Sequence, residues 1–244
     1  MVEFEFHSCA VIINCLAPLT LGRSGTVDFA PRTPPITDSP IRLAVCVSGG
    51  GTTLQNLIDL IRARRLQAEI VQVVASRPRI GAIARAEGAG LPLSLASQTA
   101  HSSAEFSASV FDPIRHSRAD LVILGGFLAL VKIPRDYKGC VINVHPALIP
   151  AFCGKGFFGA KVHQAVLDAG VKISGCTVHF ADDAYDNGPI ILQRTVPVLE
   201  DDTLETLSAR VFHEECKALP EAIELYAAGR LKLEGRRVSL LSPR

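Results

Sequence analysis

Two polar side chains stand at the end of an apolar run in the stretch VINVHPALIP, residues Val141–Pro150. Alternate residues of a strand share a face, so Asn143 and His145 would point into the same space. A carboxamide beside an imidazole suits a carbonyl oxygen that becomes an oxyanion, because the amide donates a hydrogen bond and the imidazolium a proton. A histidine at a strand end can equally be a structural residue, so this pair alone leaves catalysis open.

Three carboxylates follow a second apolar run, in GCTVHFADDAYDNGPII, where Asp182, Asp183 and Asp186 share one loop. Aspartate is favoured in turns for backbone reasons, so a solvated turn is one interpretation and a metal site is another. The loop lacks the alternating oxygen ligands, central glycine and terminal glutamate of a calcium loop, and the neighbouring histidines match no zinc spacing. We therefore expect no metal.

Three consecutive glycines follow a third apolar run, in SGGGTTLQN, residues 48–56. A glycine loop between a strand and a helix N-terminus lets backbone N–H groups converge on an anion, and the helix dipole favours negative charge. The stretch has neither the third spaced glycine of a dinucleotide fingerprint nor the lysine of a nucleotide P-loop. Thr52 and Thr53 could donate hydroxyl hydrogen bonds or cap the helix. The pattern indicates a phosphate site, and a tight turn without a ligand is the alternative.

The elements that would position these residues alternate between apolar runs and amphipathic stretches, which is typical of α/β folds. The strand-like runs are short and strongly apolar, as expected of parallel strands covered on both faces. We therefore predict the α/β class, with a mostly parallel twisted sheet and helices on both faces. The predicted strands are 41–47, 69–76, 91–96, 120–126, 140–144, 173–180 and 190–198, and the predicted helices are 53–66, 81–88 and 104–115.

Composition restricts the function classes. The chain has 244 residues, 48% hydrophobic and 20% charged, which is enough to bury a substantial core. A formal net charge of +1 gives no basic field for a phosphate backbone, so we expect no nucleic-acid partner. The seven cysteines form no Cys-x-x-Cys pair, which is typical of buried thiols in a reducing compartment and favours a cytoplasmic protein.

The first forty residues differ from the rest. SCAVIINCLAPLTLG resembles a short signal-peptide core, but Glu3 and Glu5 precede it where a secretory signal carries positive charge, and the run is too short to span a bilayer. The Pro/Ser/Thr-rich stretch Arg23–Pro40 has the composition of a linker. We expect residues 1–40 to be a poorly ordered appendage, residues 41–244 to be one catalytic domain, and no membrane association.

Five stretches occur together in the order seen in phosphoribosylglycinamide formyltransferases: SGGGTTLQ, LGGFLALV, INVHPALIP, GCTVHFADDAYDNGPIILQ and RVFHEECKALPEAI. The chain resembles this family from residue 41 to about residue 238. The resemblance implies a Rossmann-like fold and transfer of a formyl group from 10-formyltetrahydrofolate, as co-substrate, to the amine of 5′-phosphoribosylglycinamide (glycinamide ribonucleotide) in purine synthesis. It also implies that Asn143, His145 and Asp186 are the catalytic residues.

The resemblance assigns further residues to the two substrates. Gly51, Thr52 and Thr53 are expected to contact the substrate phosphate, and Glu215 the ribose or glycinamide part. Asn143 and protonated His145 would stabilise the tetrahedral oxyanion, and Asp186 would hold the imidazolium.

On the folate side, four residues of GGFLALV are expected to line the pterin pocket. They are Leu128, Ala129, Leu130 and Val131. Family members often carry a basic residue where Ala129 stands, which leaves the contacts to the folate glutamate tail open.

A long loop, Ala151–Val166, replaces the short His-rich loop of many family members, and the roles of Lys155 and His163 stay open. A formyltetrahydrofolate deformylase, which passes the formyl group to water, usually has a preceding regulatory domain. A methionyl-tRNA formyltransferase lacks this phosphate loop and adds a basic domain. A non-catalytic module that binds phosphoribosyl ligands is the third alternative. The sequence leaves open whether the chain is a monomer or a homodimer.

Overall fold

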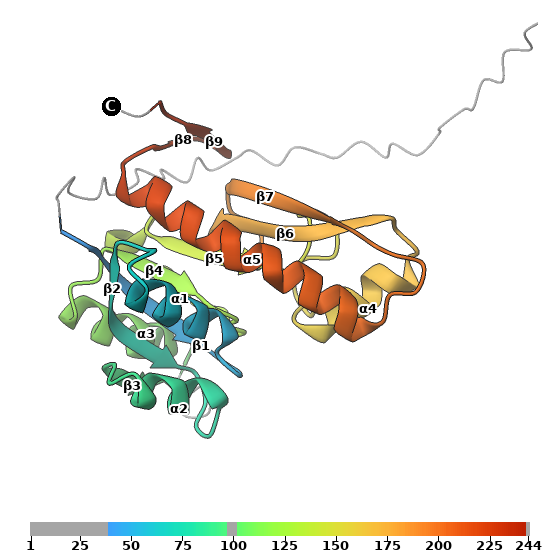
Figure 1. The fold of residues 1–244 in the computed structure, drawn as a ribbon. Helices are drawn as coiled ribbons and strands as arrows, with labels where there is room; N and C mark the ends of the chain where they lie inside the picture. Colours follow the sequence, from blue (N-terminus) through green and yellow to red (C-terminus); the bar gives the residue numbers. More distant parts are fainter. Residues whose placement is uncertain (1–38, 97–101, 243–244) are drawn as a thin grey trace, which may run out of the picture.

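The computed structural model describes residues 39–96 and 102–242, so the predicted appendage lies outside the described residues, apart from its last two positions. The chain alternates strands and helices through its first half (Figure 1). The elements of this half are β1 (Ile41–Val47), α1 (Thr52–Arg62), β2 (Ala68–Ala75), α2 (Gly81–Gly88), β3 (Leu93–Leu95), α3 (Ser103–His116) and β4 (Leu121–Leu124).

The second half begins with a short 3-10 helix, Arg135–Tyr137, and ends with a hairpin. Its other elements are β5 (Val141–His145), α4 (Ala160–Asp168), β6 (Ile173–Phe180), β7 (Ile190–Pro197), α5 (Leu204–Ala227), β8 (Leu231–Glu234) and β9 (Arg237–Leu240). The predicted strands and helices are all present, with ends that differ by a few residues.

One mixed sheet contains every described strand, in the order β3-β2-β1-β4-β5-β6-β7-β9-β8. The strands from β3 to β5 pair in parallel, whereas β6 runs antiparallel to both β5 and β7. The α/β prediction of a mostly parallel sheet is confirmed. The antiparallel strands of the second half are an addition that the alternating apolar pattern did not reveal.

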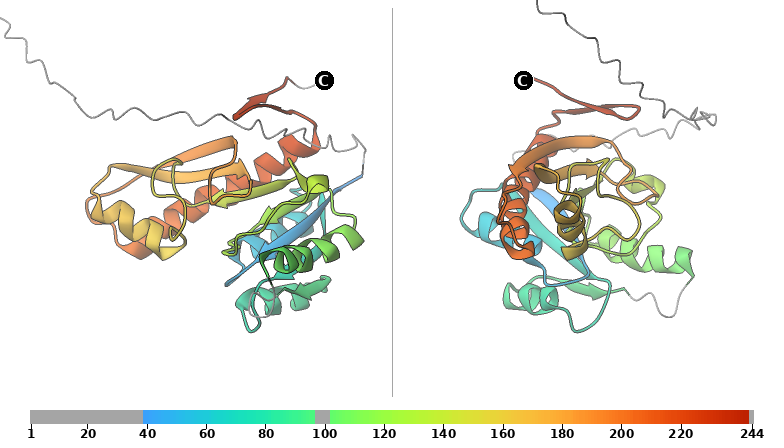
Figure 2. Two further views of the ribbon diagram at one scale, coloured as in Figure 1. Left: turned by 180° about the vertical axis from the view of Figure 1, so that it is seen from behind. Right: turned by 90° about the vertical axis from the view of Figure 1, so that its right-hand side faces the viewer.

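Helices cover both faces of the sheet. In the right-hand view of Figure 2, α1 and α5 lie against one face and α3 against the other. The central strands are buried on both faces, as β1 illustrates: six of its seven residues are buried. The 24-residue α5 begins with a capping box in which the Thr203 hydroxyl accepts from the Thr206 N–H, and it packs along β6 and β7.

The carboxyl ends of the parallel strands point to one edge of the sheet, where ligands bind in open α/β folds. The glycine loop follows β1, the folate-side segment follows β4, and Asn143 and His145 lie among the last three residues of β5. The parallel register places Leu124 of β4 beside Asn143. The fold therefore brings the glycine loop, the folate-side segment and the Asn143/His145 pair to the same edge.

Candidate active site

Asn143 lies opposite His179, because β6 pairs antiparallel with β5 in that register. The Asn143 amide nitrogen Nδ2 lies 3.0 Å from His179 Nε2 and 3.3 Å from Asp186 Oδ1. Nδ1 of His179 faces the Phe180 carbonyl at 2.9 Å, so it carries the ring proton, and Nε2 accepts from Asn143. Burial lowers the pKa of His179, which keeps the ring neutral in this role.

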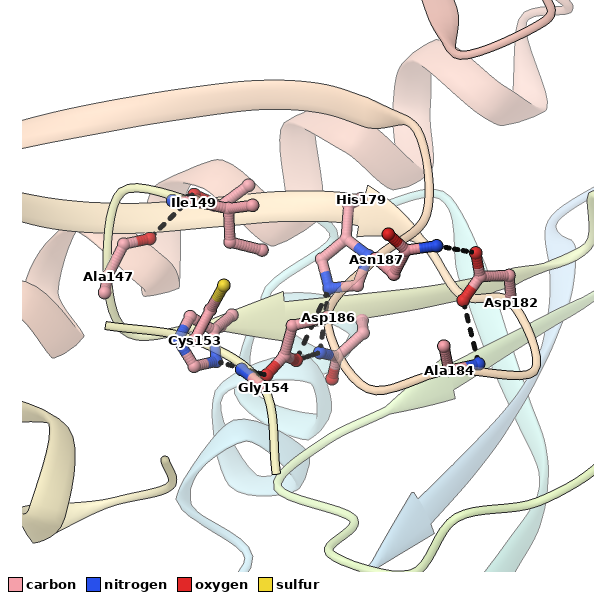
Figure 3. Close-up of polar contacts among 12 residues, drawn as sticks. Ala147, Ile149, Cys153, Gly154, His179, Asp182, Ala184, Asp186 and Asn187 are labelled. Carbon is pink, nitrogen blue, oxygen red and sulfur yellow. Dashed lines mark hydrogen bonds and ion pairs between the residues drawn. The ribbon is translucent and has the colours of Figure 1, made fainter. Parts of the chain in front are cut away.

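Asp186 joins β5 to the loop that follows it. Its Oδ2 accepts a hydrogen bond from the Gly154 N–H at 2.9 Å, as Figure 3 shows. The same oxygen lies 3.5 Å from His145 Nδ1. The side chain is only 10% exposed, and its backbone adopts a left-handed φ of +51°. Together with the Asn143 contact, these contacts attach the carboxylate to β5 and to the loop that follows it.

His145 has oxygen acceptors on both sides. Its Nε2 lies 2.8 Å from the Phe152 carbonyl oxygen, and its Nδ1 faces Asp186. His145 as a whole is 3% exposed. Since both nitrogens face oxygen atoms, an imidazolium at this position has an acceptor for each of its protons.

The other aspartates of the acidic loop have structural roles. Asp182 accepts hydrogen bonds from the Ala184 N–H at 3.0 Å and from the Asn187 amide at 2.8 Å, as Figure 3 shows. Asp183 accepts from the Ile133 N–H at 2.9 Å and so ties the loop to the folate-side segment. The solvated-turn interpretation thus describes these two residues. The described residues contain no group of three or more side chains placed to hold a metal ion.

A cavity of about 750 Å³ opens on one side of the three predicted catalytic residues. Its walls include Thr52 and Thr53 at the start of α1 and Glu215 on α5. Burial raises the pKa of Glu215 to about 7. The cavity therefore combines the positive end of a helix dipole with a carboxyl group that is readily protonated.

The glycine loop reaches this cavity through a tight turn. Gly51 has a φ of +75°, and a Cβ added to it would lie 2.7 Å from the Cβ of Ala82 on α2. Among the described residues, no side chain caps α1, so the N–H groups of its first turn keep their hydrogen-bonding capacity. Gly51 itself is not among the residues lining the cavity, whereas Thr52 and Thr53 are.

A second, smaller cavity of about 50 Å³ lies beyond the same residues. Asn143 and Asp186 line both cavities, and His179 lines only the small one. Of the predicted folate-side residues, Ala129, Leu130 and Val131 line the small cavity and Leu128 lines the large one. The amide and the carboxylate therefore stand at the junction between the two spaces.

The long loop after β5, for which the sequence predicted no role, forms a wall of the large cavity. Lys155 is exposed there, and His163 on α4 is 5% exposed. The Nδ1 atom of His163 has no hydrogen-bond partner among the described residues. Burial, and secondarily the nearby His145, lowers the pKa of His163.

Cys153 donates to the Pro150 carbonyl, and burial raises the pKa of its thiol, so it is a poor nucleophile.

Comparison with known proteins now identifies the family. The family model described as Formyl transferase matches residues 41–223. The chain belongs to the formyl transferase family. This confirms the resemblance seen in the sequence, and the match covers most of the described fold.

Individual relatives agree. Glycinamide ribonucleotide transformylase 1 from Symbiobacterium toebii is 39% identical, with a TM-score of 0.78 over 84% of this chain and 96% of that one. The chloroplastic phosphoribosylglycinamide formyltransferase of Vigna unguiculata is 35% identical over 83% of this chain and 66% of its own length. The bovine trifunctional purine biosynthetic protein adenosine-3 is 39% identical over 79% of this chain, which spans only 19% of that protein.

Sequence reasoning missed the role of His179, although it placed the residue correctly in a strand. Its contact with Asn143 follows from the pairing of β5 with β6, which are separated by a loop and a helix. A second histidine preceding an acidic loop was the one available signal. The contact of His145 with the Phe152 carbonyl could not be found from the sequence, because that carbonyl is a backbone group in a loop.

Proposed function

We propose that this chain transfers the formyl group of 10-formyltetrahydrofolate to the amine of 5′-phosphoribosylglycinamide. The observation that carries the proposal is the position of Asn143 and Asp186 at the junction of two cavities, with His145 beside Asp186. The large cavity would hold the phosphoribosyl substrate, and the folate-side residues that line the two cavities would contact the folate. The names of the relatives support the same reaction.

In this proposal the amine attacks the formyl carbon, and the formyl oxygen becomes an oxyanion. Collapse of this intermediate breaks the bond between the formyl carbon and N10 of the folate, and the proton lost by the amine passes to N10, so tetrahydrofolate leaves. Asn143 would donate a hydrogen bond to that oxygen, and protonated His145 would supply positive charge. Both hydrogens of the Asn143 amide currently face His179 and Asp186, so one must turn to the substrate. The longer contact, 3.3 Å to Asp186, is the one we expect to be released.

The phosphate would bind at the N-terminus of α1, where Gly51, Thr52 and Thr53 provide backbone N–H groups and hydroxyls. Glu215 would bind the ribose or the glycinamide part. Leu128, Ala129, Leu130 and Val131 would contact the folate. Direct transfer needs no covalent enzyme intermediate, so Cys153 has no required role.

We also propose a cellular location for the protein. No helix in the described part of the chain is long and apolar enough to cross a membrane. We propose a cytoplasmic location because the five described cysteines are free thiols, as expected in a reducing compartment. Residues 1–40 would be an appendage outside the catalytic domain. Light scattering of the purified protein would distinguish a monomer from a homodimer.

The decisive experiment is an assay of the purified protein with 10-formyltetrahydrofolate, with and without glycinamide ribonucleotide. We expect tetrahydrofolate release only when the amine is present. His145→Ala should lower the rate of this release by about 100-fold or more, and His213→Ala, a change of an exposed histidine on α5, should leave it unchanged. Tetrahydrofolate release that does not depend on the amine would contradict the proposal and identify the protein as a deformylase. Binding of glycinamide ribonucleotide without any turnover would also contradict the proposal and identify the protein as a non-catalytic binding module.

A further inference from the structure

We propose that Ser48 is a positioning residue that fixes the phosphate loop relative to the folate-side segment. The inference rests on the proposed function, because it concerns the alignment of the two substrates. Ser48 follows β1 directly and is 1% exposed. Its position at the start of the glycine loop gives it contacts with both neighbouring strand ends.

Every polar group of Ser48 has a partner in another segment. Its N–H donates to the Gly126 carbonyl at 3.2 Å, and its Oγ accepts from the Leu128 N–H at 3.0 Å. The same Oγ lies 2.6 Å from Oγ of Ser76, which follows β2 and is also buried. The Ser48 carbonyl accepts from the Arg77 guanidinium at 2.6 Å. One buried residue thus connects the ends of three neighbouring parallel strands.

The same two segments also approach each other closely at Gly125. A Cβ added to Gly125, just after β4, would lie 3.5 Å from Cβ and Cγ2 of Thr53 on α1. Thr53 and Leu128 both line the large cavity. The loop that would hold the phosphate and the segment that would hold the folate are therefore in contact, and Ser48 is the hydrogen-bonded link between them.

This link bears on the chemical step more than on binding. Each substrate would be held by its own segment, so the distance between amine and formyl carbon depends on how the two segments are aligned. A misalignment of about 1 Å can lower a rate about 100-fold while binding persists. Loss of the Ser48 hydroxyl should therefore lower kcat and leave both KM values near their original level.

Ser76→Ala is the matched control. Like Ser48→Ala, it removes the hydrogen bond between the two buried serine hydroxyls. It leaves the hydrogen bond from the Leu128 N–H to Ser48 Oγ intact. Both serines are buried to a similar extent, so both substitutions should lower the Tm by a similar amount. Only Ser48→Ala leaves the Leu128 N–H without its partner.

The test measures kcat, both KM values and hydrogen exchange of the Leu128 amide in the two variants. We expect Ser48→Ala to lower kcat by about tenfold or more, with each KM within about threefold, and Ser76→Ala to keep kcat within about threefold. Exchange at Leu128 should accelerate in Ser48→Ala only. If Ser48→Ala does not fold, Ser48→Cys carries the same test, since a thiol fills the site but accepts weakly.

Equal loss of kcat in both variants would overturn the proposal, because the hydroxyl pair would then be purely structural. Unchanged kcat or unchanged Leu128 exchange in Ser48→Ala would also overturn it. Turnover of the unmodified protein is measured first, so a failure of the proposed function shows there. The exchange measurement needs no substrate and tests the link independently.

Discussion

Glu215 offers a test in which stability and function should change in opposite directions. It lies on α5 at the wall of the large cavity, and burial raises its pKa to about 7 from an ordinary value of 4.5. The unfolded chain would ionise it near the ordinary value. Its contribution to stability is therefore fully present below about pH 4.5 and is lost as the pH rises through about 7.

The size of the effect follows from the pKa difference. Each pKa unit corresponds to 1.36 kcal/mol, which gives an upper limit of about 3 kcal/mol at pH 8. Water in the adjacent cavity screens part of the charge, so we expect about 1–3 kcal/mol. Glu215→Gln removes the ionisable group and should raise the free energy of unfolding by that amount at pH 8. At pH 5 the gain should be below about 1 kcal/mol.

Urea denaturation of the unmodified chain and of Glu215→Gln at pH 5 and pH 8 measures this difference. Glu214→Gln is the matched control on the same helix. The Glu214 carboxylate lies 2.6 Å from the Lys217 ammonium, and this hydrogen bond lowers its pKa, so its loss should destabilise the protein at pH 8. In the formyl-transfer assay, Glu215→Gln should raise the KM for glycinamide ribonucleotide and leave the KM for the folate unchanged. A gain in stability that is equal at both pH values would refute the reasoning.

Three further predictions concern the site and the chain boundary. Gly51→Val should raise the KM for glycinamide ribonucleotide far more than that for the folate, since the side chain would meet Ala82 and displace the loop; equal effects in steady-state kinetics would contradict the phosphate assignment. His145→Ala and Asp186→Asn should each lower kcat by about 100-fold or more and should not be additive, because the two side chains lie 3.5 Å apart; a double variant that loses the full product would argue against coupling. A chain that begins at Pro40 should fold and keep its activity because β1 starts at the next residue, and loss of soluble protein on expression would show that the preceding residues pack on the domain.

The sequence alone determined the elements and the motifs. Apolar runs of 7 to 8 residues predicted β1, β2 and β6 with little error, because a buried strand must be apolar along its length. The order of the motifs determined the family. Alternation within β5 correctly paired Asn143 with His145, since strand geometry is local.

Tertiary structure decided which groups meet. The contact between Asn143 and His179 depends on the register of two strands that are distant in the chain, and no local pattern encodes that register. The local pattern left the three aspartates of the acidic loop equivalent, and only the family resemblance singled out Asp186. In the structure Asp186 turns toward Asn143 of β5, while Asp182 closes its own turn. The raised pKa of Glu215 likewise arises from burial by neighbouring elements. Local sequence fixes periodicity and turn chemistry, whereas proximity between distant segments and the resulting loss of water exist only in the folded chain.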